Sequence, residues 1–131
     1  MRKVTWAFVL FAALLWVCPQ LAHAQATRTW VSGVGDDANP CSRTAPCKTF
    51  VGALVKTAAG GEIDTLDPGG FGVVTITGAI TIAQEGTGEG GIASSGVTAI
   101  TVNAGAGDVV VLRGLQLDGG PIGSGTPAGV Q

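Results

Sequence analysis

The sequence has few side chains that can act as an acid, a base or a metal ligand. It contains one histidine, His23, no tyrosine and one methionine, and only 12% of its 131 residues are charged. Because His23 belongs to an N-terminal segment that we expect to be removed, the remaining chain has no imidazole. A Ser–His or Cys–His nucleophile and a histidine-ligated zinc are therefore excluded for residues 25–131.

The first 24 residues have the parts of a secretory signal. Two basic residues precede an apolar run over residues 4–17, and Ala22-His23-Ala24 supplies the small residues that a signal peptidase accepts. This apolar run is shorter than the apolar segment of a typical transmembrane helix. We expect a signal peptide at residues 1–24, no stable membrane span after its cleavage, and an exported chain in the periplasm or outside the cell.

Basic residues are scarce in the exported chain. Residues 25–131 contain five basic and nine acidic residues, which gives a formal net charge of −4. Proteins that bind nucleic acid place a stripe of lysine and arginine against the phosphates, and this chain has none. Nucleic acid is therefore not an expected partner.

Cysteine is also scarce, because only Cys41 and Cys47 remain after the signal is removed. In an oxidising compartment these two can pair only with each other. We predict a disulfide that pins a turn and stabilises the fold by about 2 kcal/mol. Two free buried thiols are the alternative, whereas a metal site is disfavoured because no histidine is left to complete it.

One strand and one helix are expected before the middle of the chain. Residues 30–40 read as a short strand that runs into a turn rich in Gly, Asp and Asn. From Lys48 to Ala59 the apolar residues recur at helical spacing, and Gly60-Gly61 supplies a stop. The spacing predicts one amphipathic helix whose apolar face consists of Phe50, Val51, Leu54, Val55 and Ala58.

After Gly61 the sequence changes to short runs of Thr, Val and Ile separated by glycines, which predict strands. The expected strands are residues 62–66, 73–77, 79–82, 98–103, 109–113 and 115–118. They repeat with a period of about 36 residues, so that Ile63 corresponds to Ile100 and Val74 to Val110. Each unit then consists of three strands followed by a glycine-rich excursion, which is residues 83–97 in the first copy.

Three strands per unit, with apolar residues at alternate positions and glycines at the corners, are typical of a parallel β-solenoid. Each coil of a solenoid buries its inner face by stacking on the next coil. An up-and-down barrel or a sandwich is the competing architecture, although hairpins explain a three-strand repeat less directly. We predict an all-β, right-handed parallel β-helix of about two coils with an N-terminal capping strand and helix.

Three stretches of the chain resemble the start of exported right-handed parallel β-helix proteins of the pectate-lyase-like superfamily. They are residues 30–40, 45–54 and 60–72. The resemblance implies an N-terminal cap at residues 25–61, in which Phe50 and Leu54 cover the first coil, and coils at residues 62–131. It also implies further coils and a closing cap, so we expect a truncated chain whose open end allows self-association.

Few residues are candidates for chemistry. Asp36, Asp37 and Asn39 form the densest cluster of oxygens, but calcium takes six to eight oxygens and a turn explains the cluster better. Arg113 is the only basic residue of the coils and is expected to point outward, where a solvated role is the simpler interpretation. We assign these four as candidate ligand-binding residues, with no catalytic residue and no cofactor; calcium is the alternative.

The function expected from these observations is that of a non-catalytic structural or binding scaffold. Its partner is expected to be a polysaccharide or a cell-surface component. Lyases of the superfamily use carboxylate-bound calcium and an arginine base, so one alternative is the N-terminal fragment of a polysaccharide lyase or hydrolase whose catalytic coils lie beyond Gln131. A surface adhesin module is the other alternative.

Overall fold

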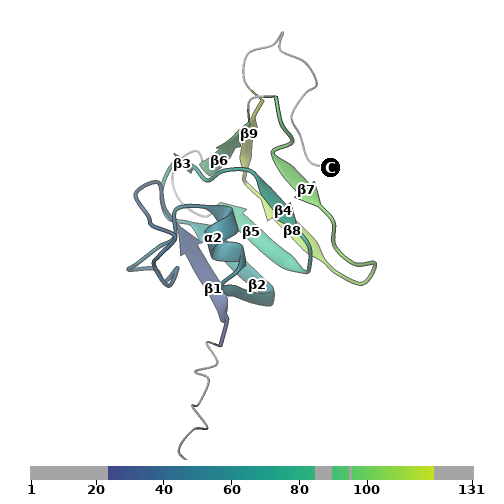
Figure 1. Ribbon diagram of the computed structural model, residues 1–131, viewed down its shortest axis with the longest axis horizontal. Helices are drawn as coiled ribbons and strands as arrows, with labels where there is room; N and C mark the ends of the chain where they lie inside the picture. Colours follow the sequence, from purple (N-terminus) through teal and green to yellow (C-terminus); the bar gives the residue numbers. More distant parts are fainter. Residues whose placement is uncertain (1–23, 85–89, 95, 120–131) are drawn as a thin grey trace, which may run out of the picture.

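The computed structural model describes residues 24–84, 90–94 and 96–119 (Figure 1). Most of the expected signal peptide therefore lies outside the described residues. Within them, the chain forms short strands and one short helix, α2 (Phe50–Leu54). The strands are β1 (Ala26–Val31), β2 (Thr57–Thr65), β3 (Gly69–Gly70), β4 (Val74–Ile76), β5 (Ile80–Gln84), β6 (Gly90–Ala93), β7 (Ile100–Val102), β8 (Val110–Arg113) and β9 (Gln116–Asp118).

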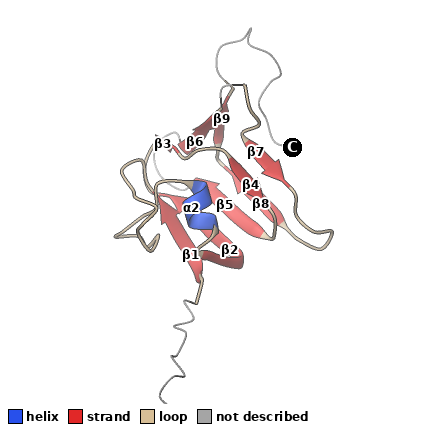
Figure 2. Ribbon diagram, viewed as in Figure 1, coloured by secondary structure: helices blue, strands red, loops and turns tan. Residues whose placement is uncertain are grey.

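The strands form three sheets, and every pairing between them is parallel (Figure 2). The four-stranded sheet has the order β1-β2-β5-β8, the three-stranded sheet β3-β6-β9, and the two-stranded sheet β4-β7. Each coil of the chain therefore contributes one strand to each of the three sheets in turn. This is a parallel β-helix with two complete coils, β2–β3–β4 and β5–β6–β7, and it confirms the predicted fold.

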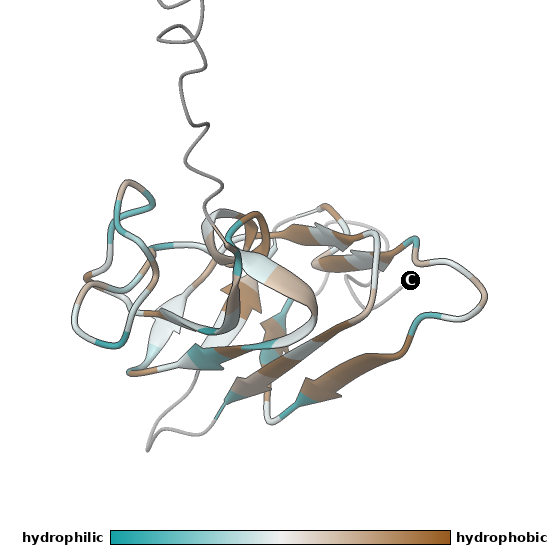
Figure 3. Ribbon diagram, turned by 90° about the horizontal axis from the view of Figure 1, so that it is seen from below, coloured by the Kyte–Doolittle hydropathy of each residue, from teal (hydrophilic) through white to brown (hydrophobic). Residues whose placement is uncertain are grey.

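The core lies inside the coils and is built from stacked aliphatic side chains. Ile63 of β2 lies beside Ile82 of β5, and Ile82 lies beside Leu112 of β8. Such in-register stacking buries the same face of each coil against the next one. Figure 3 shows several strands of the coils coloured as hydrophobic, whereas the loop between β1 and α2 is largely hydrophilic. No helix of the described residues is long and apolar enough to cross a membrane.

The register of the predicted repeat is wrong. Ile63 pairs with Ile82 and not with Ile100, and Ile100 instead pairs with Val74. Strands of a solenoid must match from coil to coil, but the turns between them can differ in length. The repeat is therefore not constant along the chain, and a fixed period of about 36 residues aligned strands of different sheets.

Two strands were not predicted because they consist largely of glycine, which gives no apolar alternation. They are β3 and β6, and β6 lies inside residues 83–97, which were predicted as an excursion. Close packing against backbone requires glycine at Gly91 of β6. A Cβ atom there would lie 2.4 Å from the carbonyl oxygen of Gln116.

Helix α2 is shorter than the predicted range of residues 48–59. Thr49 caps it, since the Thr49 hydroxyl accepts a hydrogen bond from the amide of Gly52 at 2.9 Å. The helix ends because the chain from Thr57 onward pairs with β1 as strand β2, and Gly60 and Gly61 lie within that strand. The hydrogen bonds of the sheet thus override the helical pattern of residues 56–59.

Helix α2 covers the first coil, as predicted. It contacts β1, β2 and β4, and Phe50 is fully buried with its ring 5.1 Å from that of Phe71. Leu54 packs against the core and is partly buried. Val51 and Val55 are 50% and 64% exposed, so the prediction that they belong to the inward face is wrong.

The predicted disulfide between Cys41 and Cys47 is present, and its loop covers the outer edge of β1. The amide of Trp30 donates to the carbonyl of Cys41 at 2.8 Å, and the amide of Cys47 donates to the carbonyl of Trp30 at 3.0 Å. The amide of Ser32 donates to the carbonyl of Cys47 at 2.9 Å. The first strand of the β-helix therefore has a partner on both sides, which protects it from pairing with other chains.

Candidate functional site

The oxygen-rich residues Asp36, Asp37 and Asn39 lie in the loop between β1 and α2. Oδ1 of Asp37 accepts hydrogen bonds from the backbone amides of Lys48 at 2.8 Å and Thr49 at 2.9 Å. Oδ2 accepts a hydrogen bond from the Thr49 hydroxyl at 2.7 Å. Both oxygens of Asp37 thus hold the start of α2 against the loop.

These contacts lower the pKa of Asp37 below its ordinary value of 3.8. Partial burial acts in the opposite direction and raises the pKa. The hydrogen bonds from the side chain and backbone of Thr49, the backbone of Lys48 and the positive charge of Lys56 outweigh it. Asp37 is therefore an ionised, structural carboxylate at neutral pH.

The side chains of Asp36 and Asn39 also make hydrogen bonds that stabilise a turn. Oδ1 of Asp36 accepts a hydrogen bond from the amide of Ala38 at 2.8 Å, and Nδ2 of Asn39 donates to the carbonyl of Pro46 at 2.9 Å. In the described part of the chain no group of three or more His, Cys, Asp or Glu side chains is placed to hold a metal ion. Ligand binding by this loop stays a prediction.

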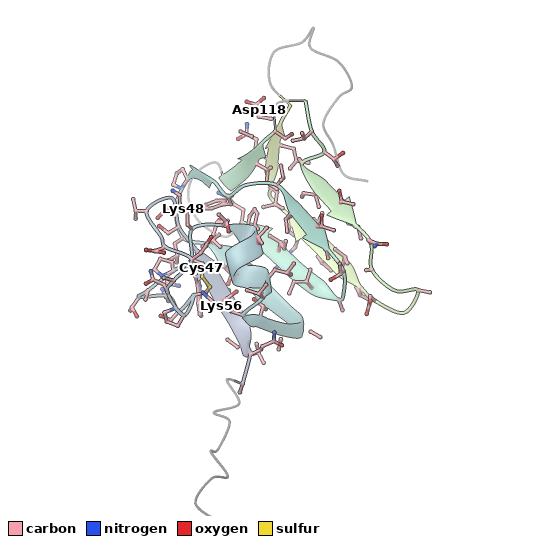
Figure 4. All side chains as sticks on the ribbon, in the orientation of Figure 1. Cys47, Lys48, Lys56 and Asp118 are labelled. Carbon is pink, nitrogen blue, oxygen red and sulfur yellow. A yellow bond between two sulfur atoms is a disulfide. The ribbon has the colours of Figure 1, made fainter. Side chains whose placement is uncertain are left out.

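The ammonium groups of two lysines donate hydrogen bonds to the same loop. Nζ of Lys56 donates to the carbonyls of Asp37 and of Asn39, the latter at 2.6 Å, and lies 3.6 Å from Sγ of Cys47. Nζ of Lys48 donates to the carbonyl of Gly33. Figure 4 shows Lys48, Cys47 and Lys56 close together beside α2, far from Asp118 at the other end of the molecule. The cap is thus a network of structural bonds.

A second group of polar side chains lies on the outer face of the four-stranded sheet. Trp30, Asp64, Ala83 and Arg113 stand beside one another on β1, β2, β5 and β8. Because side chains alternate along a strand, Glu62 lies on the same face two residues before Asp64. We call Arg28, Trp30, Glu62, Asp64 and Arg113 the outer-face group.

Asp64 is the buried member of this group, and Arg28, whose side chain is 44% exposed, pairs with it. Nε of Arg28 donates to Oδ2 of Asp64, and the Arg28 guanidinium lies 5.7 Å from the centre of the Trp30 ring. Asp64 is only 2% exposed, and its Oδ1 is buried without a hydrogen-bond partner. A buried carboxylate is costly unless a cation compensates it, so Arg28 is required to keep Asp64 in this position.

Arg113 and Glu62 form the exposed part. Nη2 of Arg113 lies 3.1 Å from Oε1 of Glu62, and this pair bridges β8 and β2 across the intervening β5. The two side chains are 56% and 29% exposed. Arg113 therefore lies on the outer face of the sheet, where strand alternation placed it.

A third carboxylate, Asp67, ties the first corner of the coil to the end of β1. Its Oδ2 accepts a hydrogen bond from the Ser32 hydroxyl and its Oδ1 one from the amide of Gly33, both at 2.5 Å. Asp67 precedes Pro68 in a bend before β3. Asp67 thus serves as a turn residue.

The four candidate ligand residues do not form a single site. Asp36, Asp37 and Asn39 lie together in the cap, whereas Arg113 lies on β8. Sequence reasoning did not recognise the other four residues of the outer-face group. The alternation of side chains along β1 and β2 indicates which residues share a face of a strand. It does not indicate which strands are neighbours.

Comparison with known proteins found no matching family model, no matching curated protein and no matching solved structure. The functional argument therefore rests on the chemistry of the residues described above.

Proposed function

We propose that the chain is an exported β-helix domain that acts as a non-catalytic scaffold and binds a polysaccharide or a cell-surface component. This proposal is based on the contacts that the carboxylates make within the fold. Six carboxylates among the described residues hold turns, start the helix or pair with arginines, so these six serve the fold and not a reacting group. They are Asp36, Asp37, Glu62, Asp64, Asp67 and Asp108.

The proposal includes membership of the pectate-lyase-like superfamily and export from the cytoplasm. The three stacked parallel sheets and the capping strand and helix support the first part. The disulfide between Cys41 and Cys47 supports the second part, because disulfides persist in oxidising compartments.

We place the binding surface on the outer-face group. Trp30 is the only tryptophan among the described residues, and it is half-buried next to Arg28 on a parallel sheet. Aromatic rings bind the C–H faces of sugar rings, and Trp and Arg are enriched at binding surfaces. The neighbouring Arg113 and Glu62 offer polar atoms for hydroxyl groups.

A polysaccharide lyase is the second candidate, and one observation favours it. Glu62 and Asp64 are two carboxylates on one outer face next to Arg113, the residue types that lyases of the superfamily combine. In this structure Arg113 pairs with Glu62. Arg113 is thereby engaged within the sheet, which is why the scaffold is preferred.

The experiment uses the chain exported from its full precursor, with the disulfide intact. Affinity electrophoresis in gels that contain polygalacturonate or a neutral β-glucan measures binding, and the release of unsaturated uronides and of reducing ends measures cleavage. We expect retardation in one gel without cleavage, and loss of retardation in Trp30→Ala. The matched control is Val34→Ala, since Val34 is 91% exposed and lies in the cap loop.

Each outcome distinguishes the candidates. No retardation in either gel, or equal retardation of both variants, would contradict binding by the outer-face group. Unsaturated products that disappear in Arg113→Gln and in Glu62→Gln would replace the scaffold by the lyase. Cleavage that persists in these two variants would contradict both assignments.

A further inference from the structure

The loop closed by Cys41 and Cys47 holds the backbone of Trp30 from both of its polar groups. The carbonyl of Cys41 accepts a hydrogen bond from the amide of Trp30 at 2.8 Å, and the amide of Cys47 donates to the carbonyl of Trp30 at 3.0 Å. The next residue, Val31, forms an isolated parallel bridge with Cys47. A change in the state of the two sulfur atoms therefore alters the contacts that position Trp30.

The two sulfur atoms have different surroundings. Sγ of Cys41 lies near two carbonyl oxygens, 3.7 Å from that of Gly52 and 4.0 Å from that of Asn39. Sγ of Cys47 lies 3.5 Å from the carbonyl oxygen of Asn39 and 3.6 Å from the ammonium nitrogen of Lys56, and Figure 4 shows Cys47 and Lys56 together beside α2. An ammonium group stabilises a thiolate, whereas a carbonyl oxygen accepts a hydrogen bond from a protonated thiol. After reduction, these surroundings suit a thiolate at Cys47 and a thiol at Cys41.

The cation and the loop are both held in place before any reduction. Nζ of Lys56 donates to the carbonyls of Asp37 and Asn39, so its third proton is left for the sulfur of Cys47. Cys41 has a φ of 59° and is the only residue other than glycine with a positive φ in the described part of the chain. Such a backbone conformation is unfavourable for a residue with a Cβ atom. Opening the disulfide lets the loop leave this conformation, which favours the reduced state.

We propose that the disulfide is a redox-sensitive switch of the cap, opened by a thiol, in which Lys56 stabilises the thiolate formed at Cys47. The thiolate of one thiol molecule bonds to Sγ of Cys41, the bond between the cysteine sulfurs breaks, and its electron pair stays on Sγ of Cys47. The thiolate of a second molecule bonds to the sulfur of the first and displaces Sγ of Cys41. The two thiol molecules are thereby oxidised to a disulfide. One of their protons passes to Cys41 and the other to water.

The reduced chain keeps its coils and loses part of the support of Trp30. The pairings of β2 with β5 and of β5 with β8 lie outside the loop, so they do not depend on the disulfide. Cys47 stays beside Lys56 and keeps its backbone bonds to Trp30 and Ser32. Cys41 is freed, and its carbonyl no longer has to meet the amide of Trp30. This inference is independent of the polysaccharide proposal.

A redox titration of the exported chain in glutathione buffers tests the switch. Cys41 and Cys47 are 1% and 0% exposed, so exchange requires local opening, and each mixture must reach equilibrium before it is quenched and alkylated. We expect the pair to be half reduced within the range of these buffers. Lys56→Met should lower the equilibrium constant for reduction by about tenfold, or about 30 mV, because the thiolate loses its cation. Lys56→Arg keeps the charge and should restore most of the constant.

The matched control for the lost lysine is Lys48→Met. Nζ of Lys48 donates to the carbonyl of Gly33 in the same loop, so this variant also removes a bond that holds the loop. Its equilibrium constant for reduction should equal that of the unaltered chain. Circular dichroism of each variant verifies that it folds.

Two further measurements need no change at Lys56. Trp30 is the only tryptophan in residues 25–131, so its fluorescence reports on β1. Reduction should shift this emission while the far-ultraviolet circular dichroism stays constant, and the shift should be absent when Cys41→Ser and Cys47→Ser are combined. Peptide mapping of the trapped mixed disulfide should find glutathione on Cys41.

Several results would overturn the proposal. A pair that stays oxidised throughout the glutathione range would be a purely structural disulfide. Equal constants for Lys56→Met and Lys56→Arg would show that the ammonium charge does not stabilise the reduced state, and glutathione on Cys47 would assign the thiolate to Cys41. Loss of the β spectrum on reduction would mean that the disulfide holds the whole fold. An unchanged emission would contradict the link to Trp30.

Discussion

The carboxylate of Asp37 accepts hydrogen bonds from both the backbone amide and the hydroxyl of Thr49, at 2.9 and 2.7 Å, across twelve residues of sequence. This contact joins the turn after β1 to the first residue before α2. Phe50 follows Thr49 directly and is the fully buried residue with which the helix closes the first coil. Asp37 therefore helps to place the cap on the coils, together with the contact between Phe50 and Phe71.

We expect Asp37→Asn to lower the free energy of unfolding by about 1 kcal/mol, because an amide accepts fewer and weaker hydrogen bonds than a carboxylate. The pH dependence gives the sharper test. Since the pKa of Asp37 is lowered in the folded state, its contribution is complete above the unfolded value near 3.8 and is lost as the pH falls through the folded pKa. Thermal melts of both proteins should therefore differ by a constant amount above about pH 5 and converge in stronger acid. A difference that grows in acid would contradict the assignment.

Gly52→Ala should destabilise the protein, although alanine normally stabilises a helix by about 1 kcal/mol relative to glycine. A Cβ atom at Gly52 would lie 2.2 Å from Oδ1 of Asp37. We expect a net loss of about 1 to 3 kcal/mol in urea unfolding, since the carboxylate must move and abandon its hydrogen bonds. The control is Gly78→Ala, where no atom lies within 4 Å of the added carbon. Equal stabilities of the two variants would show that Asp37 does not pack on the helix.

The contact between Phe50 and Phe71 should appear as coupling in a double-mutant cycle. Their ring centres lie 5.1 Å apart at an interplanar angle of 54°, and both residues are fully buried. We expect each Phe→Leu change to cost about 1 to 2 kcal/mol, with a coupling of about 0.5 to 1.5 kcal/mol. Phe50→Leu combined with Val34→Ala should be additive. Absence of coupling between the two phenylalanines would mean that α2 does not cover the first coil in solution.

Arg28→Met should destabilise the fold by about 1 to 3 kcal/mol, because it leaves the carboxylate of Asp64 buried without its arginine. Adding Asp64→Asn should recover part of this loss, since a neutral amide is less costly to bury. The exposed pair supplies the comparison, and Arg113→Met should cost less than about 1 kcal/mol. Chemical denaturation measures all three variants. If the double variant were less stable than Arg28→Met alone, the burial of Asp64 would not be the cause.

The sequence predictions were accurate for features that depend on the local sequence and less accurate for features that depend on contacts between distant segments. The six strands rich in Val, Ile and Thr were located within a few residues, because their apolar alternation is a local signal. The glycine strands β3 and β6 carry no such signal. The helix was predicted too long, because pairing of β2 with β1 is a contact between segments that the local pattern of residues 56–59 does not encode.

Local chemistry by itself determined that residues 25–131 lack imidazole, that Cys41 pairs with Cys47 and that a helix precedes a series of β-solenoid strands. Only the tertiary structure decided which strands are neighbours. Turns of unequal length separate the sides of each coil, so the register of Ile63 with Ile82 is set by packing inside the coils and not by a period in the sequence. The outer-face group exists for the same reason, because parallel pairing brings together Trp30, Asp64 and Arg113 from three strands far apart in the chain.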